Sequence, residues 1–226
     1  MLDAVRLAEE GTDAAIISRH ERLYLAWTGD DYHLNLAWSP DARQILDKLR
    51  LDQQSSTLQD DSTPSSGTTA SRWPAPPALA ATAEHLYLAW SSGWQAGWLT
   101  VMADPSCYIN LLADPEDPLS APVCLKEARS PIPPALCSHQ DSLILAWAGT
   151  DRHINILADP ETPHGAPVRL EEAKGIPALC SHQDRLILAW TGTDGHLNLA
   201  RLQQLEALLQ AEQATVAARR TGAAGP

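Results

Sequence analysis

Apolar residues alternate along four short segments of the chain, and each segment ends in a tryptophan. The segments read LYLAW, LYLAW, LILAW and LILAW, and they end at Trp27, Trp90, Trp147 and Trp190. In an extended strand, leucine and tryptophan fall on one face, and tyrosine or isoleucine and alanine fall on the other. Both faces are therefore apolar, which predicts strands in sheets that are stacked between two neighbouring sheets.

These segments belong to an internal repeat. Residues 134–173 and 177–202 share most of their sequence, and their tryptophans lie 43 residues apart. Each repeat reads as four strands, for example PALC, LILAW, HINILA and APVRL. A turn such as AGTDR separates the second strand from the third, and its Gly and Asp are typical of tight hairpins. A period of this length with four strands per unit is typical of the blades of a β-propeller.

The fourth repeat ends after its third strand, and the missing strand has a counterpart at the start of the chain. Residues 4–10, AVRLAEE, match residues 166–172, APVRLEE. An N-terminal strand that completes the last blade would close the ring and remove an open sheet edge. The sequence therefore predicts an all-β fold, a four-bladed β-propeller over residues 1–201 with an N-terminal strand closing the last blade, plus a C-terminal helix. The predicted blades span 14–51, 77–128, 134–173 and 177–201 completed by 4–10.

Three segments depart from the repeat. Residues 52–76 are rich in Ser, Thr, Gln and Pro without apolar periodicity, which predicts a disordered insertion. Blade two carries extra residues after Trp90 that include Trp94 and Trp98. The tail, residues 202–226, has apolar residues at heptad-like spacing and is predicted to be a helix that either docks on the ring or mediates a dimer. The apolar positions of this tail are Leu202, Leu205, Leu209 and Val216.

Composition narrows the function classes. The chain has 16 basic and 28 acidic residues, so its formal net charge is −12. Such a chain would repel the phosphates of nucleic acids and an anionic membrane surface, and neither is an expected partner. The first residues lack the basic and apolar regions of a secretory signal peptide, so the expected location is cytoplasmic.

The cysteines do not indicate a metal site. Cys107, Cys124, Cys137 and Cys180 show no CxxC spacing, which argues against zinc. We expect small buried thiols and neither a metal nor a cofactor.

The repeat core from Leu186 to Leu199, LILAWTGTDGHLNL, resembles the blades of bacterial β-propellers. It is similar to tectonin-type lectin repeats and, more loosely, to the Asp-box blades of sialidase-like propellers. This resemblance implies a propeller that binds a ligand. The Asp-box order Ser-x-Asp-x-Gly-x-x-Trp is not kept in this turn. Sialidase-like enzymes also use an arginine triad, and the repeats suggest no arginine that recurs at one position, so that activity is not carried over.

The candidate binding residues form a pair, two positions apart, at the start of the third strand of each repeat. A histidine, or a tyrosine in blade two, lies on the same strand face as an asparagine. These pairs would give each blade hydrogen-bonding groups for sugar hydroxyls, with nearby aromatic rings stacking on sugar faces. Alternatively, the asparagine binds the turn backbone and the histidine fills a blade interface. The ligand-binding candidates are His33, Asn35, Tyr108, Asn110, His153, Asn155, His196 and Asn198, together with Trp94 and Trp98 as an exposed patch.

An aspartate precedes three of these histidines by two residues, at Asp31, Asp151 and Asp194. It either caps its own turn, which we favour, or joins a metal site.

No nucleophile or phosphate-binding motif is present in the sequence. The expectation is therefore that the chain is not an enzyme. It is expected to be a lectin-like propeller that binds glycans at repeated sites. A protein-interaction scaffold and a degenerate glycosidase-type propeller are the alternatives. A glycan or protein ligand is the expected partner, along with a possible homo-oligomer through the C-terminal helix.

Overall fold

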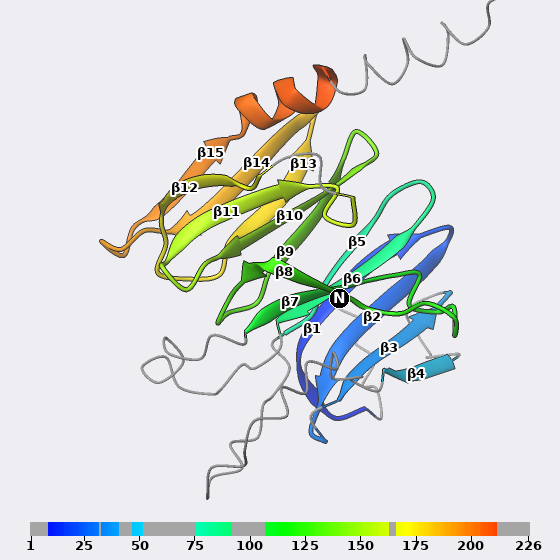
Figure 1. Cartoon of the computed structure of the whole chain (residues 1–226). Coiled ribbons are helices and arrows are strands. Elements are labelled where there is room, and N and C mark those ends of the chain that lie inside the picture. The colour runs from blue at the N-terminus through cyan, green and yellow to red at the C-terminus, as the bar shows by residue number, and fades with distance from the viewer. Residues whose placement is uncertain are drawn as a thin grey trace, which may run out of the picture.

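The chain folds as a four-bladed β-propeller, a ring of four antiparallel sheets that the described residues leave open between the last blade and the first, followed by one helix (Figure 1). The computed structural model describes residues 9–31, 33–40, 47–51, 76–91, 107–162 and 166–211. The predicted fold class is confirmed. Among the residues that the structure describes, no helix has the length and apolar character needed to cross a membrane.

In every blade the strands pair in the order in which they follow along the chain. Blade one consists of β1 (Gly11–Arg19), β2 (Arg22–Gly29), β3 (Leu34–Ser39) and β4 (Asp47–Leu51). Blade two consists of β5 (Ala78–Ala81), β6 (Leu86–Ser91), β7 (Tyr108–Ala113) and β8 (Val123–Arg129). Blade three consists of β9 (Ala135–His139), β10 (Ser142–Ala148), β11 (His153–Ala158) and β12 (Val168–Glu172). Within the described residues blade four has three strands, β13 (Ala178–His182), β14 (Arg185–Thr191) and β15 (Leu197–Arg201).

Several predicted segments lie outside the described residues. They are most of the N-terminal closing strand (4–8), most of the insertion (52–75), Trp94, Trp98 and the end of the tail (212–226). Their predicted roles stay predictions.

The first two strands of blades one, three and four are joined by the same tight turn. In blade three the turn residues Gln140 and Asp141 both have positive φ, at 49° and 66°. His139 pairs with Ser142 on either side of them. Two residues with positive φ give a type I′ turn, whose twist matches that of the strands it joins. The repeated sequence therefore sets the register between the first and second strands.

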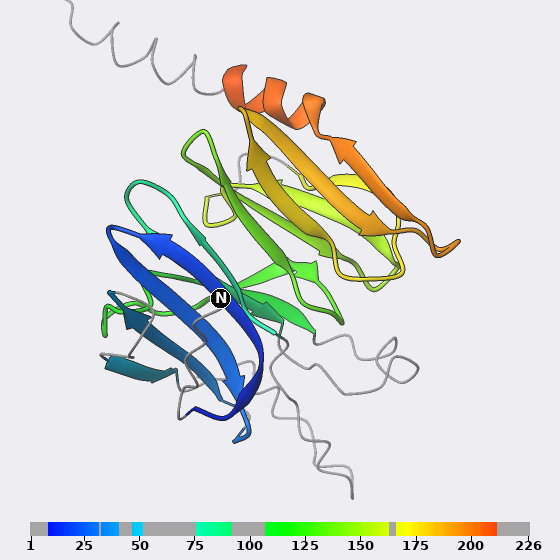
Figure 2. The ribbon, with the colours of Figure 1, turned by 180° about the vertical axis from the view of Figure 1, so that it is seen from behind.

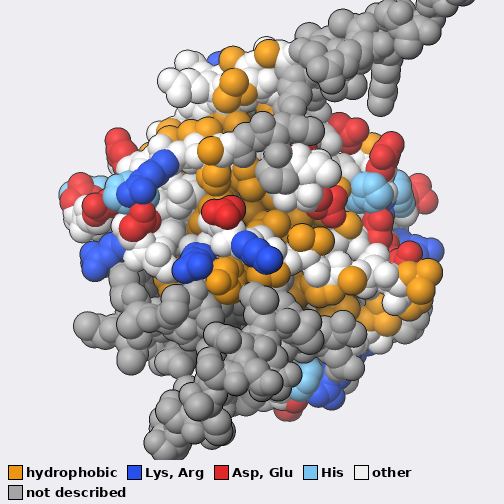
Figure 3. Space-filling view, in the orientation of Figure 1, with side chains coloured by type: hydrophobic (Ala, Val, Ile, Leu, Met, Phe, Trp, Pro, Cys, Tyr) orange, Lys and Arg blue, Asp and Glu red, His pale blue; other side chains and the backbone are white. Residues whose placement is uncertain are grey.

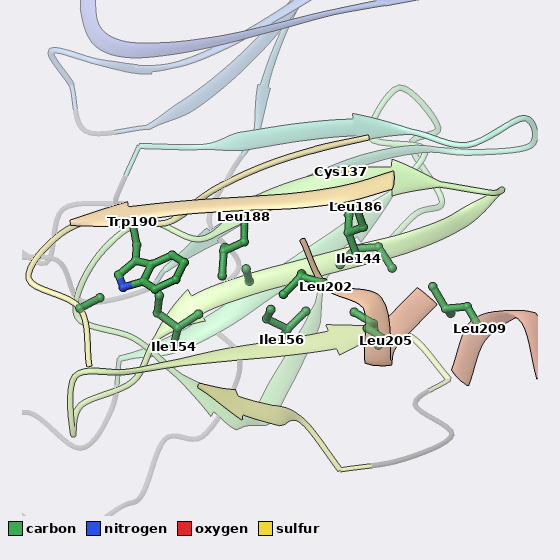
Figure 4. Packing of buried hydrophobic residues seen from close by; sticks show 12 residues of the cluster. Cys137, Ile144, Ile154, Ile156, Leu186, Leu188, Trp190, Leu202, Leu205 and Leu209 are labelled. Atoms are coloured by element: carbon green, nitrogen blue, oxygen red, sulfur yellow. The ribbon is translucent and has the colours of Figure 1, made fainter. Parts of the chain in front are cut away.

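Neighbouring blades are held together by the two apolar faces that the alternating pattern predicts. Leu145 and Trp147 of blade three pack against Tyr87, Ala89 and the rest of the tyrosine–alanine face of blade two. The same packing joins blade two to blade one and blade four to blade three. Figure 4 shows the last of these clusters, in which side chains of β14 point toward β10 and β11. The leucine–tryptophan faces of blades two, three and four therefore cover the opposite face of the preceding blade.

The C-terminal helix, residues 203–211, packs against the end of the cluster between blades three and four (Figure 4). Leu202, Leu205 and Leu209 are buried in this cluster. These leucines, which could have formed a dimer interface, are therefore buried within the chain. Docking of the helix on the ring, one of the two expected roles of the tail, is what the described residues show.

Glu206 of this helix accepts the backbone hydrogen bond that an aspartate accepts in blades two and three. In those blades Asp114 and Asp159 accept the backbone N–H of Leu86 and Leu143, at 3.1 and 2.9 Å. Glu206 accepts the N–H of Leu186 at 2.7 Å, at the same position of blade four. The helix thus supplies the carboxylate that the turn after the third strand supplies elsewhere.

Arg201 completes this buried interaction. Its Nε and Nη2 atoms donate to Oε2 of Glu206 at 3.0 and 2.7 Å. The hydrogen bond from Arg201 lowers the pKa of Glu206, and the N–H of Leu186 adds to the effect. A carboxyl group with a lowered pKa stabilises the fold above its ordinary pKa, and this contribution is lost as the pH falls through the lowered value.

We therefore expect Glu206→Gln to lower the free energy of unfolding at pH 7 by about 1–2 kcal/mol, because a charged hydrogen-bond partner is lost. The difference from the unmodified chain should shrink toward zero as the pH falls below the lowered pKa of Glu206. Urea unfolding between pH 3 and pH 8 measures it. Glu171→Gln, at an exposed position of β12, is the control and should stay within about 0.5 kcal/mol at every pH. A pH-independent loss at Glu206 would contradict the ionic role.

Candidate functional site

The turn between the second and third strands gathers charged side chains at one end of the blade. In blade three, Arg169 of β12 places Nη2 2.9 Å from Oδ2 of Asp151 and 2.9 Å from Nδ1 of His153. Nδ1 of His153 also lies 3.1 Å from the carbonyl oxygen of Asp151. All three side chains are partly exposed. Their polar atoms therefore stay within reach of a ligand while their positions are fixed by one another.

Blade one repeats this arrangement with Asp31, His33 and Arg50. The guanidinium of Arg50 lies 3.4 Å from Oδ2 of Asp31, and 2.9 and 3.0 Å from the two ring nitrogens of His33. The backbone N–H of His33 lowers the pKa of Asp31, and Arg50 and the His33 side chain lower it further. Asp31 is therefore a carboxylate at neutral pH. We call these two sets, Asp151–His153–Arg169 and Asp31–His33–Arg50, the turn trios.

Arg50 and Arg169 correct the sequence analysis, in which no arginine seemed to recur. Arg50 pairs with Asn35 across β3 and β4, and Arg169 pairs with Asn155 across β11 and β12, so the two arginines are equivalent. The sequence feature that the two arginines share is their position between two apolar residues of the fourth strand, in LRL and VRL. The first copy of that strand is too divergent for its register to be read without the pairing.

Blades two and four carry variants of the turn trio. In blade two, Arg129 lies 5.1 Å above the ring of Tyr108 and donates to its hydroxyl at 3.2 Å. In blade four, His196 and Asp194 lie 3.1 Å apart and are mostly exposed. The four predicted histidine or tyrosine positions are thus present, but each is organised within its own blade.

The asparagines serve the backbone of their own turns. Nδ2 of Asn155 donates to the carbonyl oxygen of His153 at 2.9 Å, and Asn35 does the same to His33 at 3.0 Å. Asn110 and Asn198 make the same contact at 3.5 and 3.4 Å. This geometry matches the alternative in which asparagine fixes the turn. Ligand contact by these asparagines stays a prediction.

The aspartates cap the same turns. Oδ1 of Asp31, Asp151 and Asp194 accepts the N–H of the histidine two residues on, at 3.2, 3.1 and 3.0 Å. A side chain added at Gly149 would meet Asp151 Oδ1 at 2.7 Å and Asn155 Nδ2 at 3.0 Å, so glycine is required by close approach. Within the described residues, His, Cys, Asp and Glu side chains form no group of three or more that could hold a metal ion.

Histidine side chains lie beside acidic and basic side chains at the edges of the face shown in Figure 3, and much of the area between these edges is hydrophobic. The two turn trios belong to different blades, so binding through them would use separate positions around the ring.

A second polar cluster lies at the other end of blade two. Nδ1 of His85 lies 2.6 Å from Oδ2 of Asp114, and the hydroxyl of Tyr87 donates to Glu161 of blade three at 3.4 Å. Burial, followed by the charge of Glu161, raises the pKa of Tyr87 to about 12. The phenol is therefore protonated at neutral pH, which leaves Tyr87 a hydrogen-bond donor.

Two of the four cysteines, Cys107 and Cys137, are buried, as expected. Burial raises the pKa of Cys137 to about 11. Cys180, at the equivalent position of blade four, is exposed, contrary to the expected burial.

Comparison with known proteins relates the fold of this chain to those of other β-propellers. By sequence, the chain matches no protein-family model and no curated protein. By structure, it is similar to Trypanosoma rangeli sialidase in complex with the inhibitor DANA, with a TM-score of 0.57 and 12% identity over 87% of this chain and 37% of the sialidase. It is also similar to the GH43 protein BlXynB from Bacillus licheniformis, with a TM-score of 0.55 and 18% identity over 85% of this chain and 39% of BlXynB.

A third similar structure is the GH43 endo-arabinanase from Bacillus licheniformis, with a TM-score of 0.50 and 14% identity over 87% of this chain and 72% of that protein. The chain spans less than two fifths of the sialidase and about two fifths of BlXynB. At these identities the likeness establishes a shared propeller fold. The tectonin-type resemblance stays a prediction.

These comparisons correct one expectation. The absence of familiar catalytic motifs led us to expect that the chain is not an enzyme, and that conclusion is wrong. The propellers that it resembles include a sialidase and an endo-arabinanase, which are enzymes. Motifs of unrelated folds, such as a P-loop, say little about chemistry on a propeller.

The pair of His85 and Asp114 gives a pH prediction. The hydrogen bond to Asp114 raises the pKa of His85. Its stabilising effect is therefore complete below the ordinary histidine pKa and is lost as the pH rises through the raised value. We expect His85→Gln to destabilise the chain by about 0.5 kcal/mol at pH 5.5, discounted for the partial exposure of His85, and to have a smaller effect at pH 9.

Thermal or urea unfolding at the two pH values measures this difference. His182→Gln, at an exposed position of β13, is the matched control and should show no such trend. A larger effect of His85→Gln at pH 9 than at pH 5.5 would overturn the assignment.

Proposed function

We propose that the chain is a carbohydrate-binding β-propeller that contacts sugars at its turn trios. The observation that carries this proposal is the recurrence of Asp, His and Arg, in the same geometry, in blades one and three. The aspartate and the asparagine bind the backbone of the turn, in blade four as well. The arginine adds exposed hydrogen-bonding capacity beyond these backbone contacts.

The chemistry of the turn trios suits sugar hydroxyls. A guanidinium offers planar N–H donors, and a carboxylate offers acceptors beside it, so vicinal hydroxyls can bind both. The ion pairs within each trio hold these groups in place before a ligand arrives, which lowers the entropic cost of binding. In blade two, the ring of Tyr108 offers a face for stacking next to Arg129.

The similar structures support the class of ligand. Their names describe a sialidase with a bound inhibitor and an endo-arabinanase, both of which act on sugars. We infer weak binding at each blade and a gain in strength when one glycan or surface spans two blades.

The proposal is tested with a glycan array followed by calorimetry on the best ligand. Arg169→Ala is expected to weaken binding by about tenfold or more, since a charge-assisted hydrogen bond is lost, and the double variant Arg50→Ala/Arg169→Ala to weaken it further. Arg152→Ala, which removes an exposed arginine from the same turn, is the control and should bind like the unmodified chain.

Two outcomes would contradict this function: no glycan bound on the array, or equal affinity for the unmodified chain and the double variant. Release of nitrophenol from a panel of aryl glycosides is measured alongside. Turnover that depends on Arg50 and Arg169 would extend the proposal from binding to hydrolysis.

A further inference from the structure

The outer face of blade four is apolar and exposed. Leu197 and Leu199 of β15 are 86% and 75% exposed. Their equivalents in blade three, Ile154 and Ile156, are 0% and 1% exposed, and those in blades one and two are buried to the same degree. The face is completed by Ala178, Cys180, Ile187 and Ala189, which pair across β13, β14 and β15. We call these six residues the blade-four face.

Blade one carries the complementary face. Ile16 of β1 is 66% exposed and pairs with Leu25, which lies on the same side of the sheet and is half-buried with Leu23. The residue equivalent to Ile16 in blade three is Leu136, which is 8% exposed and packs on blade two. Trp27 on the same side is 4% exposed, whereas Ile16, Leu23 and Leu25 are left without the preceding blade that covers their equivalents in blade three. We call them the blade-one face.

The two faces are the unpaired halves of one repeated interface. In the three interfaces inside the chain, a leucine–tryptophan face packs on the isoleucine- or tyrosine-containing face of the preceding blade. The blade-four face has the composition of the second kind, and the blade-one face that of the first. Both outer blades lie in front of their neighbours in Figure 2. Their opposite sides pack on blade three and blade two, so the two faces are the outer sides of the arrangement.

The start of blade one is also built as a junction with a preceding blade. Gly11 pairs with Gly29, as Ala173, at the end of blade three, bridges Gly192 of blade four. The chain thus enters blade one in the way that it passes from blade three into blade four.

We propose that the blade-four face of one copy binds the blade-one face of a second copy. The second copy is the occupant because the surface that fits the blade-four face is exposed on this same chain, and within one copy Leu199 and Ile16 stay exposed, so the two faces do not cover each other. The interface is heterologous: each copy uses one face to bind the neighbour before it and the other to bind the neighbour after it. Two copies joined at both interfaces form a closed assembly, and burial of the exposed leucines provides the driving force.

The test uses one charge on each face, at positions exposed enough to leave the blades folded. Sedimentation equilibrium of the unmodified chain should give at least twice the mass of one chain, 24.5 kDa, at micromolar concentration. Leu199→Asp and Ile16→Asp should each give single chains. A mixture of the two variants retains one intact interface per pair and should recover a species of two chains. Leu119→Asp, at a position that is 90% exposed outside both faces, should assemble like the unmodified chain.

Each alternative gives a different result. A single chain at every concentration overturns the proposal. Assembly that is lost with Leu199→Asp but kept with Ile16→Asp means that two blade-four faces pack on each other, which also overturns it. If the mixed variants do not form a two-chain species, the proposal is also overturned. Circular dichroism of each variant checks that it is folded.

A second readout needs no substitution in the faces. Cys180 belongs to the blade-four face and is exposed in the single chain. Its rate of maleimide labelling should fall about tenfold between dilute and concentrated protein as the complex forms. A rate independent of concentration would contradict assembly through this face.

Discussion

Packing of one blade against the next is the interaction on which the rest of the structure depends. The blade sheets are apolar on both sides, so each blade is stabilised by packing against its neighbours. The leucine–tryptophan side of a blade closes over the tyrosine- or isoleucine-containing side of the blade before it. This single contact, used three times, fixes the twist and spacing of the blades and leaves their ends free for polar turns.

Polar function is confined to those ends as a consequence. Between blades there is room only for side chains that pack, while the turns between the second and third strands can carry Asp, His and Arg at no cost to the core. The turn trios of blades one and three show how a position can be both structural and exposed. The aspartate and asparagine fix the turn through the backbone, and the arginine of the fourth strand extends outward from that fixed base.

Much of the fold could be predicted because short, repeated sequence patterns specify the strands and turns. The alternation around Trp147 and Trp190 gave the strands and their two apolar faces, and the Gly-Thr-Asp turns gave the hairpins. Interactions that join distant parts of the chain could not be predicted. Arg50 reaches His33 only in the register of a divergent fourth strand, and Glu206 reaches Leu186 only because a helix folds back on blade four. The expectation about enzymatic activity was wrong because it relied on motifs of other folds, whereas the structures that this propeller resembles, at low sequence identity, include enzymes.

The position of Glu206 has a consequence for the evolution of the chain. Repeats of this kind grow by duplication, and a new blade would be inserted after a third strand and its turn aspartate. In blade four that place is taken by a helix whose carboxylate binds the same backbone N–H and whose leucines fill the same cluster. A further repeat added after residue 201 would have to displace the helix and lose both contacts. The helix therefore acts as a terminator that fixes the blade count, and gain of a fifth blade at this end would require its loss first.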